Sequence, residues 1–177
     1  MLFRSVSLAP RRVIASDFAI EMLATFRKKL GSTGAHPVDL VSCNAMELPF
    51  PDASFDATIV AFGIRNFSDR LSALREMLRV LKPDGISVIL ELTTPTTPGI
   101  AQLYKAYSRW GLPLVGKVIS RNDSAYSYLP ASITKFPPHA EFLNLMSTAG
   151  FSSTECAPQT FGVATIYSGK KGIIPRA

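Results

Sequence analysis

The sequence predicts an α/β fold with a largely parallel sheet. Over the first 100 residues, short apolar runs alternate with amphipathic segments of helical spacing, which is the pattern of parallel strands joined by helices. Near the end, short apolar runs over 153–157 and 162–167 predict an antiparallel pair at the edge of that sheet. A length of 177 residues with 47% apolar and 18% charged residues fits a single globular domain.

Three apolar runs of strand length predict the first half of the sheet: 13–16, 38–43 and 55–62. The first run ends at Asp17, and the helix behind it stops at Gly31. Two prolines keep the loop 48–52 out of regular structure. The run 55–62 is apolar enough for burial on both faces of the sheet.

The second half begins with a helix that Ser68 or Asp69 caps and that ends at the turn 82–85. A fourth strand over 86–91 follows. The pattern then changes to a segment rich in threonine and proline, and a later helix over 140–149 ends at Gly150. An apolar stripe marks a helix within the intervening segment: Ile100, Leu103, Tyr104 and Tyr107, with Trp110 beyond them.

Composition excludes several classes of protein. The formal charge is +6, but most basic residues are scattered among acidic ones and form no concentrated patch. We therefore expect no nucleic-acid partner. No apolar run approaches the roughly 18 residues of a membrane-spanning helix. Cys43 and Cys156 stand far apart without a CxxC motif, which argues against a disulfide framework or a zinc site and favours the cytoplasm. No metal site is expected.

Polar residues follow the predicted strands at the edge where open parallel sheets bind ligands. Asp17 is placed to accept hydrogen bonds from a ribose diol or, equally, to cap the helix behind it. Asn44 suits a purine edge or the backbone of its own turn. The chain contains neither GxGxxG nor GxxxxGK[ST], so nothing in it is shaped to hold a pyrophosphate. A ligand without phosphates is favoured.

Four blocks resemble, in order and spacing, the quinone C-methyltransferase family, which comprises the demethylmenaquinone methyltransferases and the related polyprenyl-benzoquinol methylases: 44–52, 54–56, 62–67 and 79–85. The LPFPD and RVLKPxG blocks recur across many methyltransferases that use S-adenosylmethionine and support only that superfamily, whereas FGIRN is the narrower signal for this family. Residues 124–133 and 160–171 resemble it as well, so the likeness covers about residues 13–171. The resemblance implies a Rossmann-like class I methyltransferase fold with S-adenosylmethionine as the methyl donor.

The resemblance also implies contacts to that cofactor. Asp17 would bind the ribose hydroxyls, and Asn44 and Ala45 would contact the adenine end. Ala61 stands where relatives often carry serine, so one side-chain hydrogen bond to the cofactor is missing. We expect all four residues to bind the cofactor.

The catalytic candidates lie in the FGIRN block. Methylation of a quinol ring carbon requires a hydroxyl to lose its proton, and the fork of donors on Arg65 suits the resulting oxyanion. Asn66 would orient the same oxygen. The alternative for Arg65 is a surface ion pair with Asp69, four residues further on. His139, Asp123, Tyr126 and Tyr128 are weaker candidates for the proton acceptor.

The ends and the insertion complete the expected organisation. The family begins with a helical segment, a strand and a glycine-rich loop that this chain lacks, so residues 1–12 are expected to be the remnant of a truncated region, with reduced or lost activity. Residues 93–138 would form an apolar cover for the isoprenoid tail of a polyprenyl quinol, and 172–177 a tail.

The resemblance favours demethylmenaquinol over a benzoquinol as the substrate. Transient contact with the inner face of a membrane is left open by the modest positive charge, and the oligomeric state is left open too. Two alternatives remain at this point. The chain could methylate another lipid-like acceptor, such as a sterol or a fatty acid, or it could be a nucleotide-binding fragment without catalysis.

Overall fold

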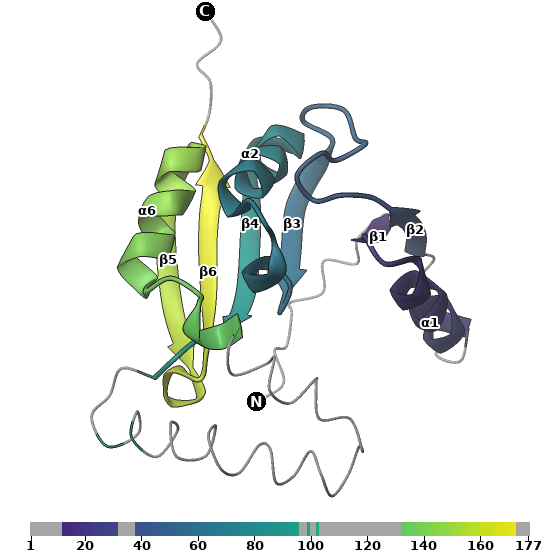
Figure 1. Cartoon of the computed structure of the whole chain (residues 1–177). Coiled ribbons are helices and arrows are strands. Elements are labelled where there is room, and N and C mark those ends of the chain that lie inside the picture. Colours follow the sequence, from purple (N-terminus) through teal and green to yellow (C-terminus); the bar gives the residue numbers. More distant parts are fainter. Residues whose placement is uncertain (1–11, 32–37, 96–98, 100–101, 103–131, 173–177) are drawn as a thin grey trace, which may run out of the picture. The chain divides into compact units, whose positions relative to one another are not determined.

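A computed structural model of the chain describes residues 12–31, 38–95, 99, 102 and 132–172 (Figure 1). The chain divides into two compact units, Met1–Pro49 and Phe50–Ala177, and each is described by itself. Most of the expected remnant, cover and tail lies outside the described residues, so those boundaries stay predictions.

The first unit is a two-stranded parallel sheet with one helix. Strand β1 (Val13–Asp17) pairs with β2 (Val38–Ser42), in register from Val13 opposite Val38 to Asp17 opposite Ser42. Helix α1 (Ile20–Gly31) connects them and contacts both strands. The two predicted strands are confirmed to within one residue, because each apolar run ends at a polar residue that stops it.

The second unit is built on a four-stranded sheet in the order β3-β4-β6-β5. Its strands are β3 (Phe55–Ala61), β4 (Leu81–Leu92), β5 (Phe151–Gln159) and β6 (Ala164–Lys171). Strands β3 and β4 are parallel, whereas β6 is antiparallel to both β4 and β5. The predicted antiparallel pair is confirmed, but only β5 lies at an edge, because β6 is inserted between β4 and β5.

Strand β4 begins five residues earlier than the sequence predicts. Phe55 pairs with Leu81 but Ala57 pairs with Ile86, so a bulge over residues 82–85 is built into the ladder. Asp84 takes a positive φ of 61° within it. A Cβ on Gly85 would lie 2.8 Å from the carbonyl oxygen of Lys82. The turn that ends the preceding helix is therefore also the start of the next strand.

Two helices cover one face of this sheet (Figure 1). Helix α2 (Arg70–Val80) begins at Asp69, whose carboxylate accepts from the backbone N–H of Ser72 at 3.0 Å. Helix α6 (His139–Ala149) ends at Gly150, which has the left-handed φ of 108°. Both ends were predicted, because side-chain caps and glycine stops are local features of the sequence.

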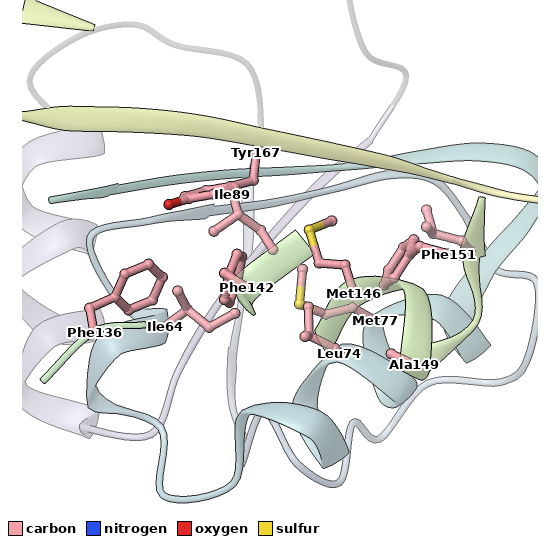
Figure 2. Close-up of a cluster of buried hydrophobic side chains, with 11 residues drawn as sticks. Ile64, Leu74, Met77, Ile89, Phe136, Phe142, Met146, Ala149, Phe151 and Tyr167 are labelled. Carbon is pink, nitrogen blue, oxygen red and sulfur yellow. The ribbon is translucent and has the colours of Figure 1, made fainter. Parts of the chain in front are cut away.

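The hydrophobic core lies between these helices and the sheet, as Figure 2 shows. Leu74 on α2 and Phe142 and Met146 on α6 are completely buried, as are Ile89 on β4 and Tyr167 on β6. The rings of Phe142 and Tyr167 meet edge to face with centroids 4.6 Å apart. Each such side chain contributes roughly 1.5–3 kcal/mol by leaving water. The core therefore fixes β4 and β6 against α6.

Strand β3 was predicted to be buried on both faces, but its two faces differ in burial. Val60 packs against the core, whereas the neighbouring Ile59 is 75% exposed. Side chains alternate along β3, and the core side of the strand is the one that carries Val60. Within the second unit, the prediction of a doubly buried strand is therefore wrong.

Among the described residues, no helix combines the length and the apolar character needed to cross a bilayer.

Candidate functional site

Asp17 lies in the first unit, as the last residue of β1. Its carboxylate is exposed, and Oδ1 accepts a hydrogen bond of 2.8 Å from the backbone N–H of Ala19. This is a local turn ahead of α1, because Ala19 precedes the first helical residue and no bond from a helical N–H to Asp17 is seen among the described residues. The contact uses one carboxylate oxygen, and Oδ2 takes no part in it, so the turn and the binding of a ribose hydroxyl are compatible.

Asn44 and Ala45 follow β2 in a tight turn. The side-chain Oδ1 of Asn44 accepts from the backbone N–H of Met46 at 3.1 Å. Its backbone carbonyl accepts from Glu47 N–H at 3.0 Å. Ala45, half-buried between them, has no side-chain hydrogen-bonding group. Asn44 therefore bonds the backbone of its own turn, which was one of its two predicted roles. This turn holds the backbone of Ala45 in one conformation beside the end of β2.

Ala61 and Asn66 lie in the second unit, on either side of a sharp bend. Ala61 is the exposed last residue of β3 and pairs with Leu90 of β4. Asn66 is the last residue of η1 (Ile64–Asn66), a 3-10 helix of one turn, and its backbone N–H donates to the carbonyl of Gly63 at 3.0 Å. Ile64, completely buried, anchors the turn in the core. Asn66 is exposed, so its side chain is accessible to a ligand.

Arg65 turns back toward β4 instead of outward. Its Nη1 lies 2.7 Å from Oε1 of Glu91, in an ion pair whose side chains are 10% and 0% exposed. Its Nε also donates to the hydroxyl of Ser132 at 3.3 Å, and Nη1 donates to the carbonyl of Phe62. The alternative considered for Arg65, a surface ion pair with Asp69, is not what forms. Asp69 instead caps α2.

Glu91 is the centre of this arrangement. Its Oε2 accepts from the backbone N–H of Arg65 at 3.1 Å, and Oε1 accepts from the backbone N–H of Leu92 at 2.8 Å. The carboxylate thus has three donors, which compensate for the loss of water around a fully buried charge. Glu91 is the last residue of the predicted strand 86–91, and no functional role was predicted for it. The available signal was an acidic residue closing an apolar strand.

A second polar group lies beside Glu91 on the same face of the sheet. Thr165 is directly opposite Glu91 in the ladder, and its hydroxyl lies 2.9 Å from that of Thr93. Thr93 also donates to the carbonyl of Gly162 at 2.9 Å. Further along β6, burial raises the pKa of Tyr167 well above its usual value, so this phenol stays protonated at neutral pH. These buried, hydrogen-bonded groups hold the end of β4 in a fixed position.

Several candidates lie outside the described residues. They are the weaker proton acceptors Asp123, Tyr126 and Tyr128, the apolar stripe from Ile100 to Tyr107, and Trp110. His139 is described: it is the first residue of α6, and its Nδ1 bonds the Tyr167 hydroxyl at 2.8 Å. This contact gives His139 a structural partner.

Most of the chain matches one known protein family. The family model described as "ubiE/COQ5 methyltransferase family" matches residues 2–171. The chain belongs to this family. The resemblance seen in the sequence blocks is thereby confirmed, and with it the prediction of a methyltransferase. In this chain, the FGIRN block forms the bend between β3 and α2, and its Arg65 forms an ion pair with Glu91.

Two curated relatives carry names from quinone biosynthesis. The chain is 43% identical over 160 residues to the demethylmenaquinone methyltransferase of Geobacillus stearothermophilus, covering 90% of this chain and 68% of the relative. It is 43% identical over 164 residues to the ubiquinone/menaquinone biosynthesis C-methyltransferase UbiE of Geobacter sulfurreducens, covering 91% and 63%. The chain therefore spans about two thirds of the length of these relatives.

A solved structure confirms the predicted fold. The SAM-dependent methyltransferase of Thermotoga maritima aligns over 90% of this chain and 72% of its own, with a TM-score of 0.63 and 18% sequence identity. At that identity the likeness establishes the fold alone. Neither named relative supports a sterol or fatty-acid methyltransferase, a non-catalytic fragment, or inactivity through truncation.

Proposed function

We propose that this chain catalyses the S-adenosylmethionine-dependent methylation of a ring carbon of a polyprenyl quinol, with demethylmenaquinol as the preferred substrate. One observation carries the proposal: 43% identity over 160 residues to a demethylmenaquinone methyltransferase, within a family match over residues 2–171. A benzoquinol is the second candidate, because the name of another relative covers both ubiquinone and menaquinone.

The cofactor contacts proposed for the first unit are Asp17, Asn44 and Ala45. Bound S-adenosylmethionine supplies a methyl group on a sulfonium. The donor set fits its adenosine end: an exposed carboxylate with Oδ2 outside the Ala19 contact for the ribose, and a fixed turn at Asn44 for the base. In the second unit Ala61 offers backbone and a small apolar surface, without the side-chain hydrogen bond of a serine.

Arg65 and Asn66 are the proposed catalytic residues. A phenol has a pKa of about 10, so a quinol hydroxyl needs help to lose its proton at neutral pH. A guanidinium does not give up its own proton and is not a base, but its positive charge favours the quinolate. Asn66, exposed on the same turn, would hold the oxygen in one orientation. The ring carbon then gains a methyl group and loses its hydrogen as a proton.

A methylation assay tests the reaction. The purified chain is given radiolabelled S-adenosylmethionine with demethylmenaquinol, a benzoquinol or a sterol in separate reactions. We expect label in the demethylmenaquinol product first, weaker transfer to the benzoquinol and none to the sterol. Transfer to the sterol alone, or to none of the three, would contradict the proposal.

Calorimetry with S-adenosylmethionine tests the cofactor contact at Asp17. We expect Asp17→Ala to weaken binding by about tenfold, the loss of a charge-assisted hydrogen bond of about 1.4 kcal/mol. Glu21→Ala is the matched control, because Glu21 is an exposed acid in the first turn of α1. Equal affinity of Asp17→Ala and the wild type would remove Asp17 from the site.

The proposed substrate has an isoprenoid tail that partitions into bilayers. We therefore propose a cytoplasmic protein that touches the inner face of the membrane transiently, with residues 93–138 covering the tail. Cosedimentation with vesicles containing demethylmenaquinol is the test. Absence of binding with substrate present would refute the membrane contact and leave the methylation assay unaffected.

A further inference from the structure

We propose that Glu91 is a positioning residue for Arg65, holding the guanidinium in the orientation that meets the quinol oxygen. This inference rests on the proposed function, in which Arg65 stabilises the quinolate. Glu91 lies near the end of β4, and Arg65 lies on the turn after β3. Because β3 and β4 are parallel neighbours, the two residues are brought together at the same end of the sheet.

One carboxylate fixes both ends of Arg65. Oε2 of Glu91 accepts from the backbone N–H of Arg65 at 3.1 Å, and Oε1 accepts from its Nη1 at 2.7 Å. A long side chain held at its backbone and at its tip has few rotamers left, so most of its conformational entropy is lost before any substrate binds. The guanidinium is thereby set in advance.

The carboxylate is itself held. The backbone N–H of Leu92 donates to Oε1 at 2.8 Å, and Glu91 is 0% exposed. Ser132 steadies the guanidinium through Nε at 3.3 Å. The carbonyl of Arg65 accepts from Nη2 of Arg70 at 2.9 Å, which pins the turn from the side of α2. Together these contacts restrict Arg65 to one orientation, as a catalytic group requires.

Glu91→Gln isolates this role, because glutamine has the size of glutamate. Its amide has one accepting oxygen, so it can accept either from Nη1 of Arg65 or from the backbone N–H of Arg65, and its NH₂ faces the other donor. The arginine stays charged and loses one of the two contacts that fix its orientation. We expect kcat for demethylmenaquinol to fall by about 10- to 100-fold with the KM for S-adenosylmethionine unchanged.

A double-mutant cycle shows whether Glu91 acts through Arg65. The four proteins are the wild type, Glu91→Gln, Arg65→Met and the double variant. If Glu91 only positions Arg65, Glu91→Gln has no further effect on kcat once Arg65 is methionine. Losses that multiply independently would overturn the inference. The double variant also removes both buried charges, so it is expected to fold if the single variant does not.

Ser132→Ala is the second probe and leaves both charges in place. It removes the Nε contact and keeps the ion pair of Arg65 with Glu91, and we expect a smaller loss of kcat, about threefold. Glu76→Gln is the matched control, because Glu76 pairs with Arg79 at 2.7 and 2.8 Å on α2. It should leave kcat unchanged. A loss of kcat for Glu76→Gln equal to that for Glu91→Gln would show a general effect of Glu–Arg pairs and overturn the inference.

The Nε–H resonance of Arg65 gives a readout that does not require turnover. In the wild type it should be dispersed and slow to exchange with water, and in Glu91→Gln it should move to the position of a solvated arginine. An unmoved resonance would overturn the inference. If the wild type methylates no quinol, the proposed function fails while the resonance still reports whether Glu91 orients Arg65. A wild-type kcat in a folded Glu91→Gln would refute the positioning role alone.

Discussion

The imidazole Nδ1 of His139 lies 2.8 Å from the hydroxyl of Tyr167. This contact joins the first residue of α6 to a completely buried residue of β6. Burial raises the pKa of Tyr167 well above its usual value, so the hydroxyl stays protonated at neutral pH. The pair therefore fixes where α6 begins on the sheet.

Tyr167→Phe tests the energy of this contact. The ring still fills the core against Phe142, so only the hydroxyl and its hydrogen bond are lost. We expect the free energy of unfolding in urea to fall by about 1 kcal/mol. The same substitution in a His139→Ala background should cost clearly less, because the partner is already gone. Equal costs in the two backgrounds would mean that the contact contributes nothing.

Gly150→Ala should destabilise the second unit. Gly150 ends α6 with a φ of 108°, and an added Cβ would lie 2.8 Å from Cδ2 of Leu78. Backbone strain and the close contact together predict a loss of about 1–2 kcal/mol in urea unfolding. Gly172→Ala is the control, because its added Cβ meets nothing closer than 3.9 Å. A Gly150→Ala protein as stable as this control would contradict the assignment of the left-handed cap.

Asp69 predicts a pH-dependent contribution to stability. The hydroxyl and backbone N–H of Ser72 bond its carboxylate and lower its pKa in the folded protein. A lowered folded-state pKa means that the stabilisation is present above the unfolded pKa of about 4 and is lost as the pH falls through the folded value. Asp69→Asn keeps a capping oxygen without the charge, so its urea midpoint should lie below the wild type at pH 7 and converge with it in acid.

Asp69→Ala separates the cap from the charge. Alanine removes the acceptor at every pH, so its deficit relative to Asp69→Asn should be present at pH 7 and persist in acid. A constant gap between the wild type and Asp69→Asn from pH 7 down to pH 3 would show that the charge of Asp69 plays no part.

The local elements were readable from the sequence. Strand β1, strand β2 and the ends of α2 and α6 follow from apolar runs bounded by polar residues, from the cap at Asp69 and from the stop at Gly150. The place of β6 inside the sheet was not readable, because strand order depends on pairings between distant segments. The exposure of Ile59 was missed for the same reason, since periodicity shows that a residue is apolar and not what covers it.

The partner of Arg65 shows the same limit at the candidate site. Sequence spacing offers Asp69, four positions away, because helical neighbours are the only side-chain pairs that spacing reveals. The residue that binds the guanidinium is Glu91, 26 positions away on the adjacent strand. The turn at Asn44 was available from the sequence, because it depends on the next few residues. The capping alternative for Asp17 is not what forms, because its carboxylate bonds the N–H of Ala19 ahead of the helix.

Two buried hydroxyls on neighbouring strands predict a substitution that does not destabilise. Thr58 of β3 stands opposite Ser87 of β4, and among the described residues neither Oγ1 of Thr58 nor Oγ of Ser87 has a hydrogen-bond partner. A buried hydroxyl without a partner costs about 1–3 kcal/mol. Ser87→Ala removes the polar atom and leaves a gap of only one oxygen, so we expect stability in urea to be unchanged or raised by up to about 1 kcal/mol.

Thr165→Val is the matched control for this prediction. Thr165 is buried like Ser87, but its hydroxyl has a partner in Thr93 at 2.9 Å. Losing that bond should lower the free energy of unfolding by about 1 kcal/mol or more, because the hydroxyl of Thr93 loses a partner. The two substitutions thus delete one buried hydroxyl each with opposite expected signs. If Ser87→Ala destabilises as much as Thr165→Val, the Ser87 hydroxyl has a partner in solution, and a buried water between Thr58 and Ser87 would supply it.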